Sequence, residues 1–271
     1  GGSIKTRTAL NMINQAEKDG LIGPDSIIVE PTSGNQGIGL ALVGAVRGYH
    51  TILVMPDSVS EERKKLMEHY GAEVRLIHDD GDIGACIAEC MNTALRMQKE
   101  NPKVFIPEQF SNPNNPMVHK YYTALEILEQ VAGPIDGFCS GIGTGGTLSG
   151  IGETLKALNP HIEIWAVEPE NAAILSGGAI GTHLQMGIGD GLIPDNLNQD
   201  IYDDLYLVTD EEAIQTAKDL ARLEGLMCGI SSGTNVAAAI QLARKLGEGK
   251  TVVTVLPDTA ERYFSTPLFE E

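Results

Sequence analysis

Apolar segments with the pattern of buried strands alternate with segments of helical spacing along this 271-residue chain. Strands are expected at residues 27–30, 51–55, 73–77, 137–139, 163–167, 205–208 and 252–256, with a short one near Val104. Helices are expected at residues 38–47, 60–70, 83–100, 117–131, 147–158, 211–223 and 234–246. Such alternation is typical of parallel sheets with helices on both faces. The sequence therefore predicts an α/β protein with two open parallel-sheet, three-layer units.

Polar or glycine-containing turns follow expected strands at Thr32, Gln109 and Gly143, and another lies at Ser231, between two expected helices. The last of them, residues 229–233, is expected to be a turn that precedes a helix. Ligands of open parallel sheets bind beyond the carboxyl ends of the strands. We therefore expect the four turns to face one cleft.

The stretch SGIGTGGTLSG at residues 140–150 joins an expected strand to an expected helix. Glycines let the backbone approach a ligand closely, and the first amides of a helix attract anions with the help of the helix dipole. This stretch is therefore a candidate phosphate site. The spacing of Gly141, Gly143 and Gly146 also satisfies the G-x-G-x-x-G dinucleotide fingerprint.

A dinucleotide site needs an acidic residue about 20 positions after the glycines to hold the ribose, and Glu163 or Glu168 lies near that distance. The residues alone leave four interpretations open. They are an NAD-dependent oxidoreductase, an enzyme with another phosphate-bearing cofactor, a non-catalytic phosphate-binding protein, and a turn that only packs a helix on a sheet.

The chain carries 37 acidic and 19 basic side chains, a formal charge of −18, which repels nucleic acid and anionic membranes. Its longest uninterrupted run of apolar residues and glycine, 37–46, is about half the ~20 residues that a membrane-spanning helix needs. The histidines are scattered, and no Cys-x-x-Cys or other metal-binding spacing occurs. We therefore expect a cytoplasmic protein with no metal, nucleic-acid or membrane partner. Its cysteines are expected to be reduced thiols: Cys86, Cys90, Cys139 and Cys228.

Six motifs follow one another along the chain: GGSIKTR at residues 1–7, TSGNQG at 32–37, EQFSNPNNP at 108–116, GTGGT at 143–147, GISSG at 229–233 and PDTAERY at 257–263. With them the chain resembles the cysteine synthase (O-acetylserine sulfhydrylase) family. These are pyridoxal-phosphate (PLP) enzymes of the tryptophan synthase β-like fold, fold type II. The resemblance decides between the candidate phosphate ligands in favour of PLP.

The resemblance also implies a domain organisation, with the PLP cleft between two α/β domains. Residues 9–110 would form a smaller, mobile domain. Residues 1–8 and 111–271 would form a larger domain that anchors the cofactor. The family has several tens of residues before its GGS motif, and the sequence given starts at that motif.

The resemblance implies a role for each residue of the cofactor site. Lys5 forms the internal aldimine and later removes the Cα proton, and its glycine, serine and isoleucine neighbours suit a partly desolvated amine. Asn35 lies beside the 3-hydroxyl of PLP, and Ser231 faces the pyridine nitrogen. A neutral serine there favours β-elimination over transamination, because it makes the cofactor a milder electron sink. The phosphate is held by the GTGGT loop: Gly143, Thr144, Gly145, Gly146 and Thr147.

The resemblance implies a PLP-dependent β-replacement on a serine derivative. A β leaving group departs to give an aminoacrylate, to which sulfide adds. The usual family reaction makes L-cysteine from O-acetyl-L-serine. The expected partners are the amino-acid substrate, sulfide or a thiol, a second copy in a homodimer, and serine acetyltransferase. The substrate carboxylate would be gripped by Thr32, Ser33, Gly34, Asn35 and Gln109.

Among the departures from the family pattern, at Thr6, Gln36, Asp190, Thr259 and Ala260, two bear on the substrate. Gln36 takes a place where threonine is frequent, and Asp190 takes one where alanine or another small residue is usual. A carboxylate at residue 190 is able to bind a substrate amino group or to relay a proton. We hypothesise that Asp190 lets the enzyme use cysteine as its β substrate, with release of hydrogen sulfide and formation of lanthionine or cystathionine. The alternative is a solvated loop aspartate without a role in the reaction.

Overall fold

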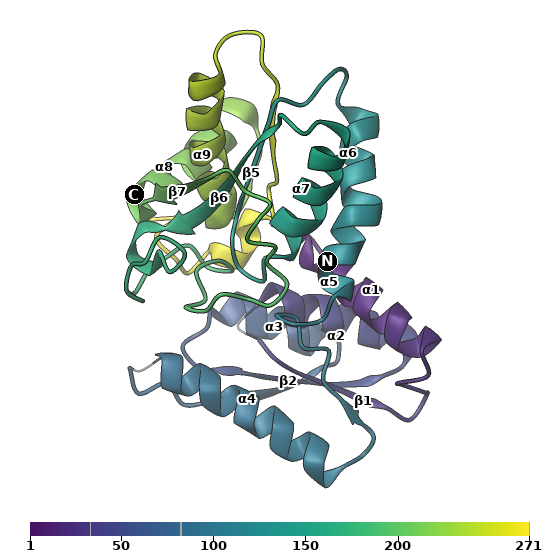
Figure 1. Cartoon of the computed structure of the whole chain (residues 1–271). Coiled ribbons are helices and arrows are strands. Elements are labelled where there is room, and N and C mark those ends of the chain that lie inside the picture. Colours follow the sequence, from purple (N-terminus) through teal and green to yellow (C-terminus); the bar gives the residue numbers. More distant parts are fainter. Residues whose placement is uncertain (33, 82, 271) are drawn as a thin grey trace. The chain divides into compact units, whose positions relative to one another are not determined.

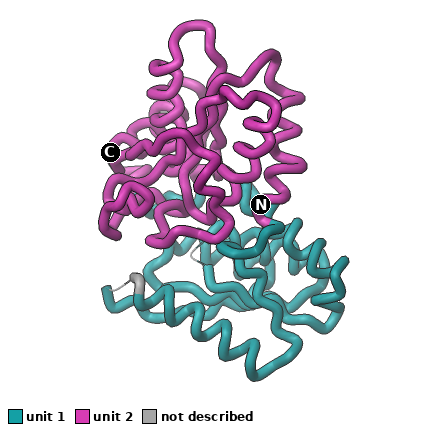
Figure 2. The backbone as a smooth tube through the Cα atoms, viewed as in Figure 1, with its two compact units in different colours: residues 1–114, 262–266 teal, residues 115–261, 267–271 magenta. Residues whose placement is uncertain are grey.

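The structure, a computed structural model, describes residues 1–32, 34–81 and 83–270 (Figure 1). The chain forms two compact units (Figure 2). Unit 1 comprises Gly1–Asn114 with Arg262–Thr266, and unit 2 comprises Asn115–Glu261 with Pro267–Glu271. Residues 1–8 group with unit 1 by their contacts. The domain bounds that the family resemblance implies remain a prediction.

Unit 1 is a parallel four-stranded sheet with helices on both faces. The strand order is β3-β2-β1-β4, and Ile28 of β1 is in register with Thr51 of β2 and Phe105 of β4. The elements in chain order are α1 (Lys5–Lys18), β1 (Ile27–Pro31), α2 (Asn35–Arg47), β2 (His50–Pro56), α3 (Glu61–His69), β3 (Glu73–Ile77), α4 (Ile83–Glu100) and β4 (Val104–Phe105).

The two faces of this sheet pack against different helices, because successive side chains of a strand point to opposite faces. Ile28 packs in one apolar cluster with Ile38 of α2. Val29, the next residue along β1, packs in another cluster with Cys90 of α4. Both faces of β1 are therefore buried, which is why Ile27, Ile28 and Val29 follow one another without a polar residue between them.

Unit 2 has the same architecture, with strand order β7-β6-β5-β8 and all strands parallel. Figure 1 shows α6 and α7 on one side of this sheet and α8 and α9 on the other. Phe138 of β5 packs with Leu148 and Ile151 of α7 in the core. The predicted α/β class with two three-layer units is confirmed. The elements are α5 (Asn114–Val118), η1 (His119–Thr123), α6 (Ala124–Gln130), β5 (Gly137–Gly141), α7 (Gly146–Leu158), β6 (Glu163–Pro169), η2 (Glu170–Ala172), β7 (Asp204–Val208), α8 (Asp210–Glu224), α9 (Ile230–Leu246), β8 (Val252–Thr254) and η3 (Ala260–Tyr263).

The expected turn at residues 229–233 is wrong, because α9 already begins at Ile230. Gly229 is its N-cap, and the Gly229 carbonyl oxygen accepts the amide hydrogens of Ser232 and Gly233 at 3.1 and 3.4 Å. A Cβ on Gly233 would lie 1.9 Å from the carbonyl oxygen of Ala213 in α8. The glycine therefore serves close packing of α9 on α8 and does not mark a turn.

The single helix expected at 117–131 is instead three consecutive segments, α5, the π-helix η1 and α6. This region packs closely on α7, since a Cβ on Gly150 would lie 2.3 Å from the carbonyl oxygen of Pro116. A π-helical turn bonds residues five apart, and the apolar spacing of the sequence does not reveal it.

Candidate active site

The amino end of α7 is an open set of backbone donors. Gly145 is the N-cap in the left-handed region, with φ 76°, and no side chain caps the helix. The amide of Ser149 makes the first bond of the helical ladder, to the Gly145 carbonyl oxygen at 3.0 Å. The amides of Gly146, Thr147 and Leu148 come before it and have no acceptor within the helix. This end of α7 is therefore suited to a phosphate.

Asn115 contacts the glycine loop. The sequence alone predicted no role for it in the site. Its Nδ2 donates to Thr144 Oγ1 at 2.9 Å. A Cβ on Gly146 would lie 2.1 Å from Asn115 Oδ1, so only glycine lets the amide side chain come this close. Asn115 is fully buried and holds the loop in place. The signal that could have found it is its place in the EQFSNPNNP motif.

The loop that carries Asp190 packs directly on the glycine loop. The amide of Gly189 donates to the Ile142 carbonyl oxygen at 2.9 Å. A Cβ on Gly143 would lie 2.4 Å from the Gly187 carbonyl oxygen and 3.4 Å from Asp190 Oδ2. The half-buried carboxylate of Asp190 thus borders the predicted phosphate loop.

Ser231 lies in the first turn of α9 and is 3% exposed. The same turn is tied to the Asp190 loop, because Thr234 Oγ1 donates to Gln185 Oε1 at 2.8 Å. It is tied to the start of the glycine loop by Asn235, whose Oδ1 accepts the amide hydrogen of Gly141 at 2.7 Å. Unit 2 thus joins Ser231, the glycine loop and the Asp190 loop in one framework.

In unit 1, the amino end of α2 is a second open set of donors. Gly34 is the N-cap, without a capping side chain, and the first ladder bond runs from the Ile38 amide to the Gly34 carbonyl oxygen at 3.2 Å. The amides of residues 36–37 precede it and suit a carboxylate. Thr32 is buried, and its Oγ1 accepts the Gly34 amide hydrogen at 3.3 Å. The predicted site residue Ser33 lies outside the described residues.

Lys5 is the first residue of α1, and its backbone packs on α2: a Cβ on Gly39 would lie 3.0 Å from the Lys5 carbonyl oxygen. Thr8 Oγ1 lies 2.9 Å from that oxygen and 2.7 Å from Gln36 Oε1. The Gln36 side chain is therefore directed at α1, one turn from Lys5. Gln36 connects the amino end of α2 to α1, the helix that begins at Lys5.

Glu30, near the end of β1, is a buried carboxyl that no motif pointed to. Its side chain is 1% exposed, and its oxygens accept the amide hydrogens of Glu108 and Gln109, each at 3.0 Å. Burial raises the pKa of Glu30 from 4.5 to about 8, and the two amides only partly oppose this rise. The sequence feature that could have pointed to Glu30 is the presence of a charged residue inside an apolar strand.

Replacing Glu30 with glutamine is expected to weaken the pH dependence of stability. The fold raises the pKa of Glu30. The contribution of Glu30 to the free energy of unfolding is therefore fully present below about pH 4.5 and is lost as the pH rises to about 8. This difference in pKa corresponds to about 5 kcal/mol at the order of magnitude. Between pH 5 and 8.5, the free energy of unfolding in urea should fall by several kcal/mol more in the wild type than in the variant. Equal pH dependence would contradict the prediction.

The buried guanidinium of Arg63 lies against Gly34 at the amino end of α2 and is held there by Tyr263. Arg63 Nη2 donates to the Tyr263 hydroxyl at 3.2 Å, and the guanidinium lies 5.2 Å from the ring centroid. A Cβ on Gly34 would lie 3.1 Å from Arg63 Nε. The PDTAERY motif, to which no role was assigned, thus contributes the residue that holds Arg63 against Gly34.

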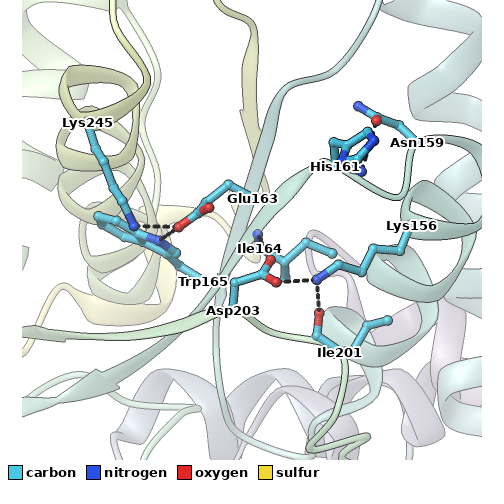
Figure 3. A network of polar contacts seen from close by, with 9 residues as sticks. All are labelled: Lys156, Asn159, His161, Glu163, Ile164, Trp165, Ile201, Asp203 and Lys245. Atoms are coloured by element: carbon cyan, nitrogen blue, oxygen red, sulfur yellow. Dashed lines mark hydrogen bonds and ion pairs between the residues drawn. The ribbon is translucent and has the colours of Figure 1, made fainter.

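The dinucleotide interpretation loses its ribose-binding residues, because both candidates are engaged within unit 2. Figure 3 shows the Glu163 side chain next to Lys245 and Trp165. Its Oε1 lies 2.5 Å from Lys245 Nζ and 3.0 Å from Trp165 Nε1. Glu168 accepts two backbone amides and a hydroxyl from the loop after β6. These contacts disfavour a site for NAD.

Of the predicted site residues, the structure places Lys5, Thr32, Gly34, Asn35 and Gln109 in unit 1. It places Gly143, Thr144, Gly145, Gly146, Thr147, Asp190 and Ser231 in unit 2. Within the described ranges, no three His, Cys, Asp or Glu side chains group as metal ligands would, and no helix is long and apolar enough to cross a membrane. The cysteines are buried free thiols.

Comparison with known proteins identifies the family. The family model described as pyridoxal-phosphate dependent enzyme matches residues 1–258. A cysteine synthase of Staphylococcus aureus is 49% identical over 273 residues, covering 99% of this chain and 86% of the relative. The chain belongs to the family of PLP-dependent enzymes, and its cofactor is PLP.

Solved structures of similar fold match nearly the whole length of this chain. Cysteine synthase (OASS) from Entamoeba histolytica is 40% identical with a TM-score of 0.94, covering 100% of this chain and 79% of that one. A hydrogen sulfide-producing enzyme from Fusobacterium nucleatum is 41% identical with a TM-score of 0.91, covering 97% and 88%. The open amides of α7 fit the phosphate of PLP.

Proposed function

We propose that this protein makes L-cysteine from O-acetyl-L-serine and sulfide by β-replacement. The observation that carries the proposal is the 49% identity to a cysteine synthase across 99% of the chain. When bound, PLP supplies the electron sink that stabilises negative charge at the substrate Cα and lets a group at Cβ leave.

The residues of the chain supply binding and proton transfer. Lys5 Nζ removes the proton at Cα and returns it after the nucleophile has added. The turn at residues 32–35 and Gln109 bind the substrate carboxylate, which is supported by the open amides of α2. The amides and hydroxyls of residues 143–147 bind the cofactor phosphate. The Ser231 hydroxyl pairs with the pyridine nitrogen without protonating it.

A spectrum and a product assay test the proposal together. Protein supplied with PLP is expected to be yellow, to bleach with borohydride and to change its absorbance when O-acetylserine is added. O-phosphoserine, serine and cysteine are compared as substrates, with sulfide and homocysteine as acceptors. Protein that stays colourless with PLP, or that forms no cysteine from O-acetylserine and sulfide, would refute the proposal.

A second candidate function is β-elimination and replacement on cysteine, with release of hydrogen sulfide. The observation that favours it is the position of the Asp190 carboxylate, which borders Gly143 of the phosphate loop. A carboxylate at this place can accept or deliver a proton at a leaving thiol. A structural relative from Fusobacterium nucleatum is a hydrogen sulfide-producing enzyme.

Replacing Asp190 with alanine is expected to slow sulfide release from cysteine by about tenfold or more, because general acid–base groups contribute ~10²–10⁴-fold when fully used. Cysteine formation from O-acetylserine should change less than threefold. The matched control is Asp195→Ala, which removes an exposed aspartate from the same loop and should change neither rate. An unchanged rate of sulfide release in Asp190→Ala would contradict a role of Asp190 in the reaction with cysteine.

We also propose that the protein works in the cytoplasm as a homodimer and binds serine acetyltransferase. Support comes from the family resemblance. Light scattering of the purified protein, alone and mixed with a serine acetyltransferase, tests both associations. A monomer at micromolar concentration would contradict the first, and unchanged mass of the mixture would contradict the second.

A further inference from the structure

Glu30 joins two loops of unit 1 at one buried carboxyl. It lies in β1, two residues before Thr32. Its side chain reaches across to the loop after β4, where it accepts the amide hydrogens of Glu108 and Gln109. A buried carboxyl requires such donors, because an unpaired one costs several kcal/mol.

The loop that Glu30 holds has an unusual backbone. Glu108 has φ 58° and is the sole non-glycine residue with positive φ in the part of the chain that the structure describes. This left-handed conformation costs about 1–2 kcal/mol for a residue with a Cβ. Successive amides next to a left-handed residue form a concave nest that binds an anion. The Glu30 carboxyl group lies in this nest and accepts both of its amide hydrogens.

Gln109, which donates its amide hydrogen to Glu30, is the residue that the family resemblance assigns to substrate binding. Gln109 is buried, and its own amide is one of the two that Glu30 accepts. Residues 108–112 form a compact loop, because the amides of Ser111 and Asn112 both donate to the Glu108 carbonyl oxygen. The conformation of this loop therefore depends on the contact with β1, and with it the placement of the Gln109 side chain.

We propose that Glu30 is a positioning residue of the substrate-carboxylate site, which fixes Gln109 relative to the turn at Thr32. The inference rests on the proposed function, which gives Gln109 its ligand. The ionised form of Glu30 offers two full acceptors to the two amides, whereas glutamine offers only one oxygen. The raised pKa of about 8 sets the conditions for a test, because both acceptors are present above it.

The test is a double-mutant cycle on ligand binding at pH 8.5. PLP-loaded wild type, Glu30→Gln, Gln109→Ala and the double variant are titrated with L-alanine, which has a carboxylate and no leaving group. The readout is the absorbance change of the bound cofactor. We expect each single variant to raise the dissociation constant about tenfold. The double variant should exceed Gln109→Ala by less than twofold, because Glu30 acts through Gln109.

Glu168→Gln is the matched control. Glu168 is a buried carboxyl near the end of β6 that also accepts two successive backbone amides, from Leu175 and Ser176. The Glu168→Gln variant should keep the dissociation constant for alanine within twofold of the wild-type value. If Glu30→Gln does not fold, the cycle is run with Glu30→Asp, which keeps the charge but is one methylene shorter.

Additive effects of Glu30→Gln and Gln109→Ala would overturn the inference, and so would an unchanged dissociation constant in Glu30→Gln. A wild type that binds alanine without forming cysteine would contradict the proposed function alone. The positioning role would still be decided by the cycle. A wild type with no response to alanine would overturn both.

Discussion

Replacement of Lys5 with alanine is expected to lower cysteine formation by at least about 10³-fold. Proton transfer at Cα by a positioned side chain contributes ~10²–10⁴-fold, and the loss of the nucleophilic amine adds to this. Lys5 is the first residue of α1, and its backbone packs on Gly39 of α2. No other side chain is proposed to take over its proton transfer. Initial rates with O-acetylserine and sulfide, at saturating PLP, measure the effect.

The control for Lys5 is Lys18→Ala, which removes an exposed lysine from the other end of the same helix and should keep the wild-type rate. Borohydride treatment followed by peptide mass analysis should find reduced cofactor on the peptide with Lys5 in the wild type, and none there in Lys5→Ala. A Lys5→Ala variant with more than a tenth of the wild-type rate would show that Lys5 is not the base.

The sheets were predictable because parallel strands buried on both faces have continuous apolar runs. The expected strand at 27–30 and the observed β1 (Ile27–Pro31) differ by a single residue. The start of α9 was not predictable in this way. Ser231, Ser232 and Gly233 have the composition of a turn. Only the close contact of Gly233 with Ala213, far away in the sequence, explains the glycine.

The candidate site residues could be assigned from the sequence only where they lie in contiguous motifs, and their roles stay predictions. Lys5 and the GTGGT loop belong to such motifs, and the open amides of α7 agree with a phosphate site. Glu30 and Arg63 were not predictable, because their roles arise from contacts across the fold. Glu30 meets amides 78 and 79 residues further along the chain, and Arg63 meets Tyr263.

The structure gives a different interpretation of Gln36, the residue that replaces the family's frequent threonine. In the sequence it adjoins the residues expected to bind the substrate carboxylate, which indicates an effect on substrate fit. The side chain is 2% exposed, and its Oε1 lies 2.7 Å from Thr8 Oγ1 in α1. An effect of Gln36 on substrate choice would thus act through the helix that carries Lys5.

Replacement of Gly143 with alanine is expected to weaken PLP binding by about 5- to 150-fold, the equivalent of the ~1–3 kcal/mol that overpacking costs. The added Cβ would lie 2.4 Å from the Gly187 carbonyl oxygen, closer than non-bonded atoms approach. That oxygen belongs to the backbone of the Asp190 loop, so no side-chain rotation relieves the clash. Either this loop or the phosphate loop must move. Titration of the apoprotein with PLP, followed by absorbance, measures the dissociation constant.

The same substitution at Gly23 separates this steric effect from the general cost of replacing glycine. Gly23, like Gly143, has no positive φ, and a Cβ there would meet no atom within 4 Å. Gly23→Ala should therefore bind PLP within twofold of the wild type. If Gly143→Ala also binds PLP within twofold, the close packing of the two loops is not what shapes the phosphate site. If it binds PLP weakly and also releases sulfide from cysteine more slowly, the shift of the Gly187–Asp190 backbone accounts for both, because one displacement moves the phosphate loop and the carboxylate together.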